Sequence, residues 1–198
     1  MSKVTAGITV SIDGYITGPD DGPAKGLGEG GERIHYWVFG GPWTYGEESR
    51  GEATGEAKAY FEDAMARCGA VVCGRNMYEA ARHWGGKNPW GPPVFIVTHR
   101  PEEEPDSGEF NFVDGVEAAI ERAKEAAGEA EVNIGGGGDV IRQALSAGLV
   151  DSLDIIVAPV IMGAGKRLFD GFGESLDLEV TGVREAPLAT FLSYDIKK

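Results

Sequence analysis

The sequence predicts an α/β fold with a mixed, mostly parallel central sheet, a C-terminal antiparallel hairpin and helices on both faces of the sheet. Between residues 54 and 163, short apolar runs alternate with helical patterns, which is typical of parallel strands joined by helices. The segment 176–196 holds two alternating runs joined by a short turn, which indicates an antiparallel hairpin. No repeat or linker interrupts the chain, so we expect a single domain over residues 1–198.

Composition limits the classes of function. The net charge of −14 argues against nucleic acid as a partner, because an acidic surface repels phosphates. The N-terminus lacks an apolar run long enough for a signal peptide or a membrane helix, and the two cysteines, Cys68 and Cys73, are too few for a disulfide scaffold. We therefore expect a cytoplasmic protein without a membrane partner. The 31 glycines, twice the usual share of about 7%, indicate turns and close backbone contacts.

The N-terminal quarter begins with a strand and continues into a long loop. Residues 4–11 form an apolar, β-rich run that ends before Asp13-Gly14. The loop over 17–43 is rich in glycine, proline and acid but also carries aromatic residues such as Trp37 and Trp43. We expect these aromatics to pack back onto the domain, as core residues or as a lid over a ligand.

The middle of the chain alternates helices with buried strands. The pattern at 54–69 predicts a helix with Thr54 as N-cap and Gly69 beyond its end, and a strand follows at 70–74. Asn76, with Glu79 three residues later, is a candidate N-cap for a helix over 76–84. The apolar runs at 93–100 and 110–113 then predict two further strands.

The second half continues the same alternation. Residues 114–128 predict a helix with Asp114 as N-cap and Gly128 after its end. A strand at 131–134 leads into four consecutive glycines, and the helix over 139–148 is predicted to begin with Asp139 as N-cap. The run 151–163 predicts a further strand before the closing hairpin.

Hydrogen-bond donors follow four of the predicted parallel strands. They are Gly74-Arg75-Asn76, Thr98-His99-Arg100, the glycine run Gly135–Gly138 and the segment 161–167. The carboxyl ends of parallel strands meet at one edge of a sheet, where ligands of open α/β folds bind. Two of these segments also open helices, whose free N–H groups and dipole favour an anion. The sequence therefore predicts a phosphate-bearing ligand.

Two common phosphate-binding motifs are absent. The pair Gly165-Lys166 is followed by Arg167, which does not match a P-loop. A dinucleotide fingerprint that starts at Gly135 would end at Val140 instead of glycine. The protein is thus neither a Walker-type ATPase nor a standard Rossmann dehydrogenase.

The segments "SIDGYI", "GAVVCGRNMYE", "VFIVTHR" and "IGGGGDVIRQALSAGLVDSLDIIVAPVIMGAGKRLFDG", with the closing hairpin, resemble the dihydrofolate-reductase-like superfamily. The branch they resemble most is the reductase domain of bifunctional riboflavin-biosynthesis enzymes and its stand-alone relatives. The resemblance implies a three-layer dihydrofolate-reductase-like fold. It also implies hydride transfer from NADPH to a small pterin-, flavin- or aminopyrimidine-like heterocycle, as in 5-amino-6-(5-phosphoribosylamino)uracil reductase.

The resemblance also implies site residues. It places Asp13 beside the reaction as the catalytic candidate. The sequence has no zinc signature, so we expect no metal. The residues that the resemblance assigns to the cofactor are Gly14, Gly74, Arg75, Met77, Thr98, His99, Arg100, Gly136, Gly137, Gly138, Asp139 and Val140. The residues that it assigns to the substrate are Gly163, Gly165 and Lys166. It further implies a cis Gly–Gly bond within Gly135–Gly137.

Several of these residues also have simpler interpretations that do not involve a ligand. Arg75 could pair with Glu79, Arg100 could be a surface arginine beside a run of glutamates, and Asp13 could be a turn former. Because no carboxylate aligns with the one in the pteridine pocket of folate reductases, the alternative function is a nucleotide- or flavin-binding protein without turnover. The apolar residues of the hairpin and of the strand before it predict a homodimer.

Overall fold

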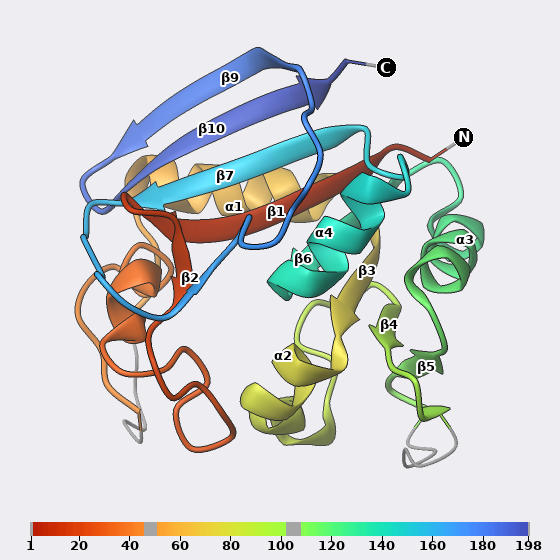
Figure 1. Ribbon diagram of the computed structural model, residues 1–198, viewed down its shortest axis with the longest axis horizontal. Coiled ribbons are helices and arrows are strands. Elements are labelled where there is room, and N and C mark those ends of the chain that lie inside the picture. Colours follow the sequence, from red (N-terminus) through yellow and green to blue (C-terminus); the bar gives the residue numbers. More distant parts are fainter. Residues whose placement is uncertain (1, 46–50, 102–107, 198) are drawn as a thin grey trace.

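A computed structural model describes residues 2–45, 51–101 and 108–197. Its main feature is an eight-stranded sheet with the order β5-β4-β3-β6-β1-β7-β10-β9 (Figure 1). The strands are β1 (Val4–Ser11), β3 (Cys68–Gly74), β4 (Val94–Val97), β5 (Asn111–Val113), β6 (Glu131–Gly136), β7 (Ser152–Ala158), β9 (Leu178–Ala186) and β10 (Ala189–Ile196). The first six strands in this order pair in parallel, while β10 is antiparallel to both β7 and β9.

Helices cover both faces of this sheet. The helices are α1 (Gly55–Arg67), α2 (Arg75–Ala80), α3 (Val116–Ala127) and α4 (Gly138–Ser146), with 3-10 helices η1 (Gly31–His35) and η2 (Arg82–Gly86). In Figure 1, α3 and α4 lie in front of the sheet and α1 lies behind it. A short pair, β2 (Tyr15–Thr17) with β8 (Lys166–Arg167), forms a separate ribbon that the sequence did not predict. The predicted fold class is confirmed, including the antiparallel hairpin.

The main hydrophobic core lies between the sheet and the helices α3 and α4. Alternate residues of β1 and β6, such as Ala6 and Ile134, are fully buried there against Ile120 of α3 and Ile141 of α4. The intervening residues of the same strands face α1. This period of two explains why β1 can build a core on one side and a different surface on the other.

Three predicted N-caps are wrong. The cap positions of α2, α3 and α4 are occupied by glycines, and none of these helices has a side-chain cap. Asp114 precedes the cap of α3, and its carboxylate lies 3.1 Å from Nδ1 of His99. Asp139 lies inside the first turn of α4, where it accepts hydrogen bonds from Arg142 and Gln143. Asn76 likewise lies inside α2.

Three element boundaries also differ from the prediction. Helix α2 ends at Ala80, because the residues 82–84 that were expected to be helical have positive φ angles. Gly69 lies within β3 instead of after α1, and a Cβ there would come within 2.7 Å of Cβ of Ala130. Strand β7 stops at Ala158 because Pro159, which follows, has no N–H for the ladder.

Candidate functional site

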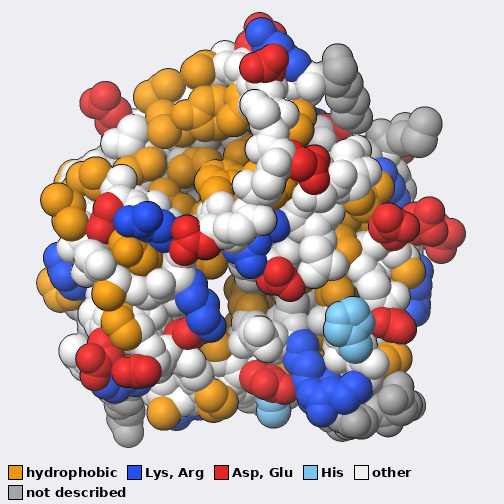
Figure 2. Space-filling view, viewed as in Figure 1, with side chains coloured by type: hydrophobic (Ala, Val, Ile, Leu, Met, Phe, Trp, Pro, Cys, Tyr) orange, Lys and Arg blue, Asp and Glu red, His pale blue; other side chains and the backbone are white. Residues whose placement is uncertain are grey.

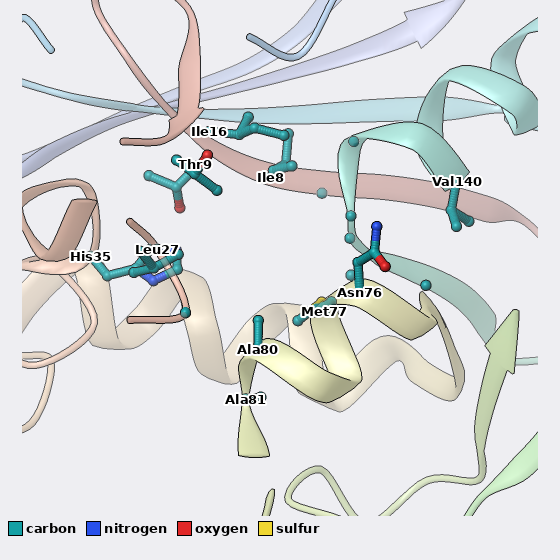
Figure 3. A pocket seen from close by; sticks show the side chains of 18 of the residues that line it. Ile8, Thr9, Ile16, Leu27, His35, Asn76, Met77, Ala80, Ala81 and Val140 are labelled. Carbon is teal, nitrogen blue, oxygen red and sulfur yellow. The ribbon is translucent and has the colours of Figure 1, made fainter. Parts of the chain in front are cut away.

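A cavity of about 1320 Å³ opens at the carboxyl edge of the sheet. Strands β1 and β6 pair only over Val4–Ala6 and Val132–Ile134, so they separate before their carboxyl ends. Figure 3 shows the cavity between α2, which contributes Asn76 and Met77, and the loop that carries Leu27 and His35. Figure 2 shows the surface hollowed near the middle of the view, with Lys and Arg side chains beside the opening.

Most of the predicted site residues meet at this cavity. Those that line it are Gly74, Arg75, Met77, Thr98, His99, Arg100, Gly136, Gly137, Gly138, Asp139, Val140, Gly165 and Lys166. They come from the carboxyl ends of β3, β4 and β6 and from the segment before β8. Asp13, Gly14 and Gly163 do not line the cavity; they form the neighbouring turn described below.

The last three of the four consecutive glycines, Gly136 to Gly138, differ in their surroundings. Gly136 has a φ of 129°, and the bond between Gly136 and Gly137 is cis, as predicted. A Cβ on Gly138 would lie 2.6 Å from Cδ1 of Ile16, so a larger residue here would require the end of the Ile16 side chain to move. A Cβ on Gly137 would meet nothing within 4 Å, so its backbone faces open space in the cavity. Gly137 therefore leaves room for a ligand at the start of α4.

The N-terminus of α4 is exposed to the same space. No side chain caps this helix, and its first turn contains Gly138, Asp139 and Val140. The first N–H groups of a helix have no partners within the helix, and they carry the positive end of its dipole. Gly74 brings β3 close to this turn, because a Cβ there would lie 3.0 Å from Cγ2 of Val140. This end of the cavity suits an anion such as a diphosphate.

Arg75 joins the ends of two neighbouring strands. Its Nε lies 2.7 Å from Oε1 of Glu79, so the simpler interpretation of this arginine is observed. Its Nη1 also donates to Oγ1 of Thr98 at 3.2 Å, and the same oxygen accepts the backbone N–H of Arg100 at 3.2 Å. These contacts hold the ends of β3 and β4 together, with the exposed Arg100 at the rim of the cavity.

Asp13 fixes the turn after β1 to the loop after β7. Its carboxylate accepts the backbone N–H groups of Met162 at 3.0 Å and Gly163 at 2.8 Å, and it accepts the hydroxyl of Ser11 at 2.7 Å. The hydrogen bond from Met162 is the main cause that lowers the pKa of Asp13 to about 2. A carboxylate with this pKa stays ionised at neutral pH, so these contacts give Asp13 a structural role. Its catalytic role stays a prediction.

Sequence reasoning missed several polar residues that line the cavity, among them Arg142, Asn133 and His35. Nη1 of Arg142 donates to the carbonyl of Leu168 at 2.9 Å, and its Nη2 lies 3.1 Å from Oδ1 of Asp139. Asn133 lies on β6 before the glycines, and His35 ends η1. Burial lowers the pKa of His35 to about 4, so this imidazole is neutral at physiological pH. Among these residues, only Arg142 had a signal in the sequence, which is its position three residues after Asp139.

The aromatic residues of the long loop pack as core residues. Trp37 is buried, donates its indole N–H to Oγ1 of Thr9 at 3.1 Å and contacts the rings of Tyr60 and Phe191 edge-on. Trp43 is also buried. Both side chains line the cavity wall, and T-shaped contacts with neighbouring rings hold them there. They therefore form part of a fixed wall.

No group of three or more His, Cys, Asp or Glu side chains in the part of the chain that the structure describes is arranged to hold a metal ion. Nor is any helix in the described ranges long and apolar enough to cross a membrane.

Comparison with known proteins places the chain in a family. Residues 2–189 match the model of the RibD C-terminal domain. A relative, the uncharacterized protein YwjB of Bacillus subtilis (strain 168), is 24% identical over 144 residues, which cover 72% of this chain and 82% of that protein.

Three solved structures share the fold. A putative riboflavin biosynthesis protein from Shewanella sp. PV-4 has a TM-score of 0.70 at 24% identity and covers 99% of both chains. A pyrimidine reductase-like protein from Corynebacterium diphtheriae has a TM-score of 0.62 at 16% identity, with 100% of this chain and 92% of that chain covered. Dihydrofolate reductase from Enterococcus faecalis, complexed with NADP(H) and RAB-propyl, has a TM-score of 0.61 at 14% identity, with 99% and 97% covered. Because the matched residues 2–189 include seven of the eight strands of the sheet, β10 excepted, and the glycine-lined edge, the chain belongs to the RibD C-terminal domain family.

Proposed function

We propose that the chain, acting as one domain, is an NADPH-dependent reductase of a small pterin-, flavin- or aminopyrimidine-like heterocycle. The observation that carries the proposal is the meeting of three strand ends and an uncapped helix at one cavity. The family is that of a reductase domain, and a neighbour with the same fold is a dihydrofolate reductase complexed with NADP(H).

The residues at the cavity edge fit this cofactor. The backbone of Gly136–Gly138 and the first turn of α4 would hold the diphosphate, since Gly137 leaves open space there. Thr98, His99 and Arg100 would surround the 2′-phosphate at the rim, where a guanidinium matches phosphate oxygens. When bound, NADPH supplies the hydride. The chain's own residues bind it, orient it and keep water from the reacting atoms.

The segment 163–167 borders the other side of the cavity and would contact the substrate. A Cβ on Gly165 would lie 1.9 Å from the carbonyl oxygen of Thr17, so this segment packs tightly against β2. Nζ of Lys166 lies 2.7 Å from Oδ2 of Asp21. We propose that Asp13 serves the site as a positioning residue, because its contacts with Met162 and Gly163 fix the start of this segment.

The test is to mix the protein with NADPH and a panel of pterins, flavins and aminopyrimidines and to follow the dihydronicotinamide absorbance. Oxidation of NADPH that depends on one member of the panel is the expected result. NADPH binding without oxidation by any member favours the alternative, a nucleotide- or flavin-binding protein without turnover. We keep this alternative function because none of the residues assigned to the site is identified as a proton donor.

We also propose that the protein is a homodimer. Val180 and Val183 of the edge strand β9 are 61% and 56% exposed, and Figure 2 shows hydrophobic side chains gathered over β9 and β10. A two-fold contact between copies would cover this surface. Sedimentation at micromolar concentration should give a dimer, and a Val180→Lys, Val183→Lys double variant should sediment as a folded monomer. A monomeric wild-type protein contradicts this proposal.

A further inference from the structure

The cavity continues from the sheet edge into an inner compartment beneath α1. We define this compartment by its floor, Gly7, Asn133 and Gly135, and by its roof on α1, Tyr60 with Phe61 and Met65. Helix α1 is anchored at its sides: Arg184 of β9 lies 2.7 Å from Asp63, and the Tyr60 hydroxyl donates to Asp154 at 3.3 Å. The space between floor and roof adjoins the glycine turn where the cofactor would bind.

The floor leaves the amide of Asn133 free for a ligand. Gly7 and Gly135 have no side chains, and a Cβ on Gly135 would lie 3.7 Å from Oδ1 of Asn133. The amide therefore extends over Gly135 towards the glycine turn. Asn133 is half-buried, and its amide makes no hydrogen bond with any residue that the structure describes. A polar group in such a place gains free energy when a ligand satisfies it.

No charged side chain lines this compartment within the described ranges. The ionised residues of the cavity, such as Arg142 and Lys166, lie at the carboxyl edge instead. The nearby Asp154 is buried beside Gly7, and the hydroxyl of Tyr60 is directed at its carboxylate. His35, on the adjoining loop, is neutral because burial lowers its pKa to about 4. A charged ring placed here would lose hydration without gaining a counter-ion.

We propose that Asn133 recognises an uncharged, planar heterocycle through its cyclic amide, and that this recognition sets substrate specificity. The side-chain amide carries one acceptor and two donors, so it can pair with a ring –CO–NH– edge through two hydrogen bonds. Phe61 and Met65 supply apolar roof surface for the face of the ring. This inference rests on the proposed reductase function. Within the substrate class proposed above, Asn133 would select rings that carry an unsubstituted cyclic amide and no ionised group.

The first probe is lumazine, which has cyclic amide edges, and the second is 1,3-dimethyllumazine, in which methyl groups replace both N–H donors of these edges. The third is pterin-6-carboxylate, which keeps a cyclic amide but bears an ionised carboxylate on its ring. Each is titrated by calorimetry into the wild-type protein, with and without NADP+. We expect lumazine to bind at least about tenfold more tightly than either of the other two, because a polar site rejects analogues that leave it unpaired.

Two variants make the test specific to this side chain. Asn133→Leu should weaken lumazine about tenfold or more and remove the preference over 1,3-dimethyllumazine, while NADP+ affinity stays within about twofold. Asn111→Leu, which changes a half-buried asparagine of β5 that does not line the cavity, should leave lumazine affinity unchanged. Circular dichroism confirms that both variants are folded.

The results separate this inference from the proposed function. Failure of NADP+ to bind contradicts the proposed function, whereas the preference between the two lumazines is measured with or without NADP+. No lumazine binding, equal affinity for lumazine and its dimethyl analogue, tighter binding of pterin-6-carboxylate, or an Asn133→Leu variant with wild-type lumazine affinity each overturns the assignment of Asn133.

Discussion

The two faces of β1 and β6 differ in composition and in function. On the face covered by α3 and α4, residues such as Ala6 and Ile134 are completely buried in a continuous apolar core. On the face towards α1, the neighbouring residues Gly7, Asn133 and Gly135 are small or polar and line a cavity. One strand can thus stabilise the fold with one set of alternate residues and form a site with the other.

The sharpest test of this difference is a pair of adjacent substitutions on β6. Ile134→Ala removes a fully buried side chain and should lower the free energy of unfolding by about 2–5 kcal/mol. Gly135→Ala places a methyl group on the cavity face, at ordinary contact distance from Asn133 and Val71, and should change it by less than about 1 kcal/mol. Urea unfolding of both variants measures this. Equal losses would show that both faces are packed core.

The two faces should also differ in their response to pH. His35 lies on the cavity side, and its pKa of about 4 is below the ordinary value of 6.5. The unfolded chain therefore takes up a proton near pH 6.5, whereas the folded protein does so only near pH 4. The free energy of unfolding should fall by up to about 3 kcal/mol between these values as the pH decreases.

Substitution isolates this contribution. A His35→Phe variant should lose the decrease between pH 6.5 and 4, while His99→Phe, which changes an exposed histidine, should retain it. Urea titrations at several pH values measure the effect. An unchanged pH profile in His35→Phe would assign the decrease to other groups.

Gly137 tests whether the cavity edge is a binding surface or only a turn. A valine side chain would occupy the open space that Gly137 faces and should weaken NADPH binding by about 100-fold or more. Gly173→Val is the control, because a Cβ at this exposed glycine also meets nothing within 4 Å. Fluorescence titration measures affinity and circular dichroism measures folding. A folded Gly137→Val protein with wild-type affinity would mean that the glycines form only a turn.

The sequence predicts the residues at the carboxyl edge of the sheet better than those of the inner compartment. The glycine run, Arg75 and the Thr98–Arg100 segment each follow a strand, so a general rule about strand ends was enough to bring them together. Asn133 and His35 become neighbours of the cavity only through the separation of β1 from β6 and the course of the long loop. These are tertiary features, and no local sequence pattern predicts them.

Helix starts and small strands show the same limit. A polar residue near a helix start was taken as the cap, but glycine occupies the cap of α4 while Asp139 pairs with Arg142 inside the helix. The strands β2 and β8 contain three and two residues, too few for a recognisable period. By contrast, the apolar, β-rich run at 4–11 was long enough to predict strand β1 with its observed bounds.

The most direct test of the account is to titrate NADPH and NADH, at one salt concentration, into the wild-type protein and into Arg100→Ala. The cofactors differ by the 2′-phosphate, and a charge-assisted contact from Arg100 at the cavity rim should favour NADPH by about 10- to 150-fold. The account predicts that Arg100→Ala loses this preference with little change for NADH. Equal affinities of the wild-type protein for both cofactors, or binding of neither, would contradict it.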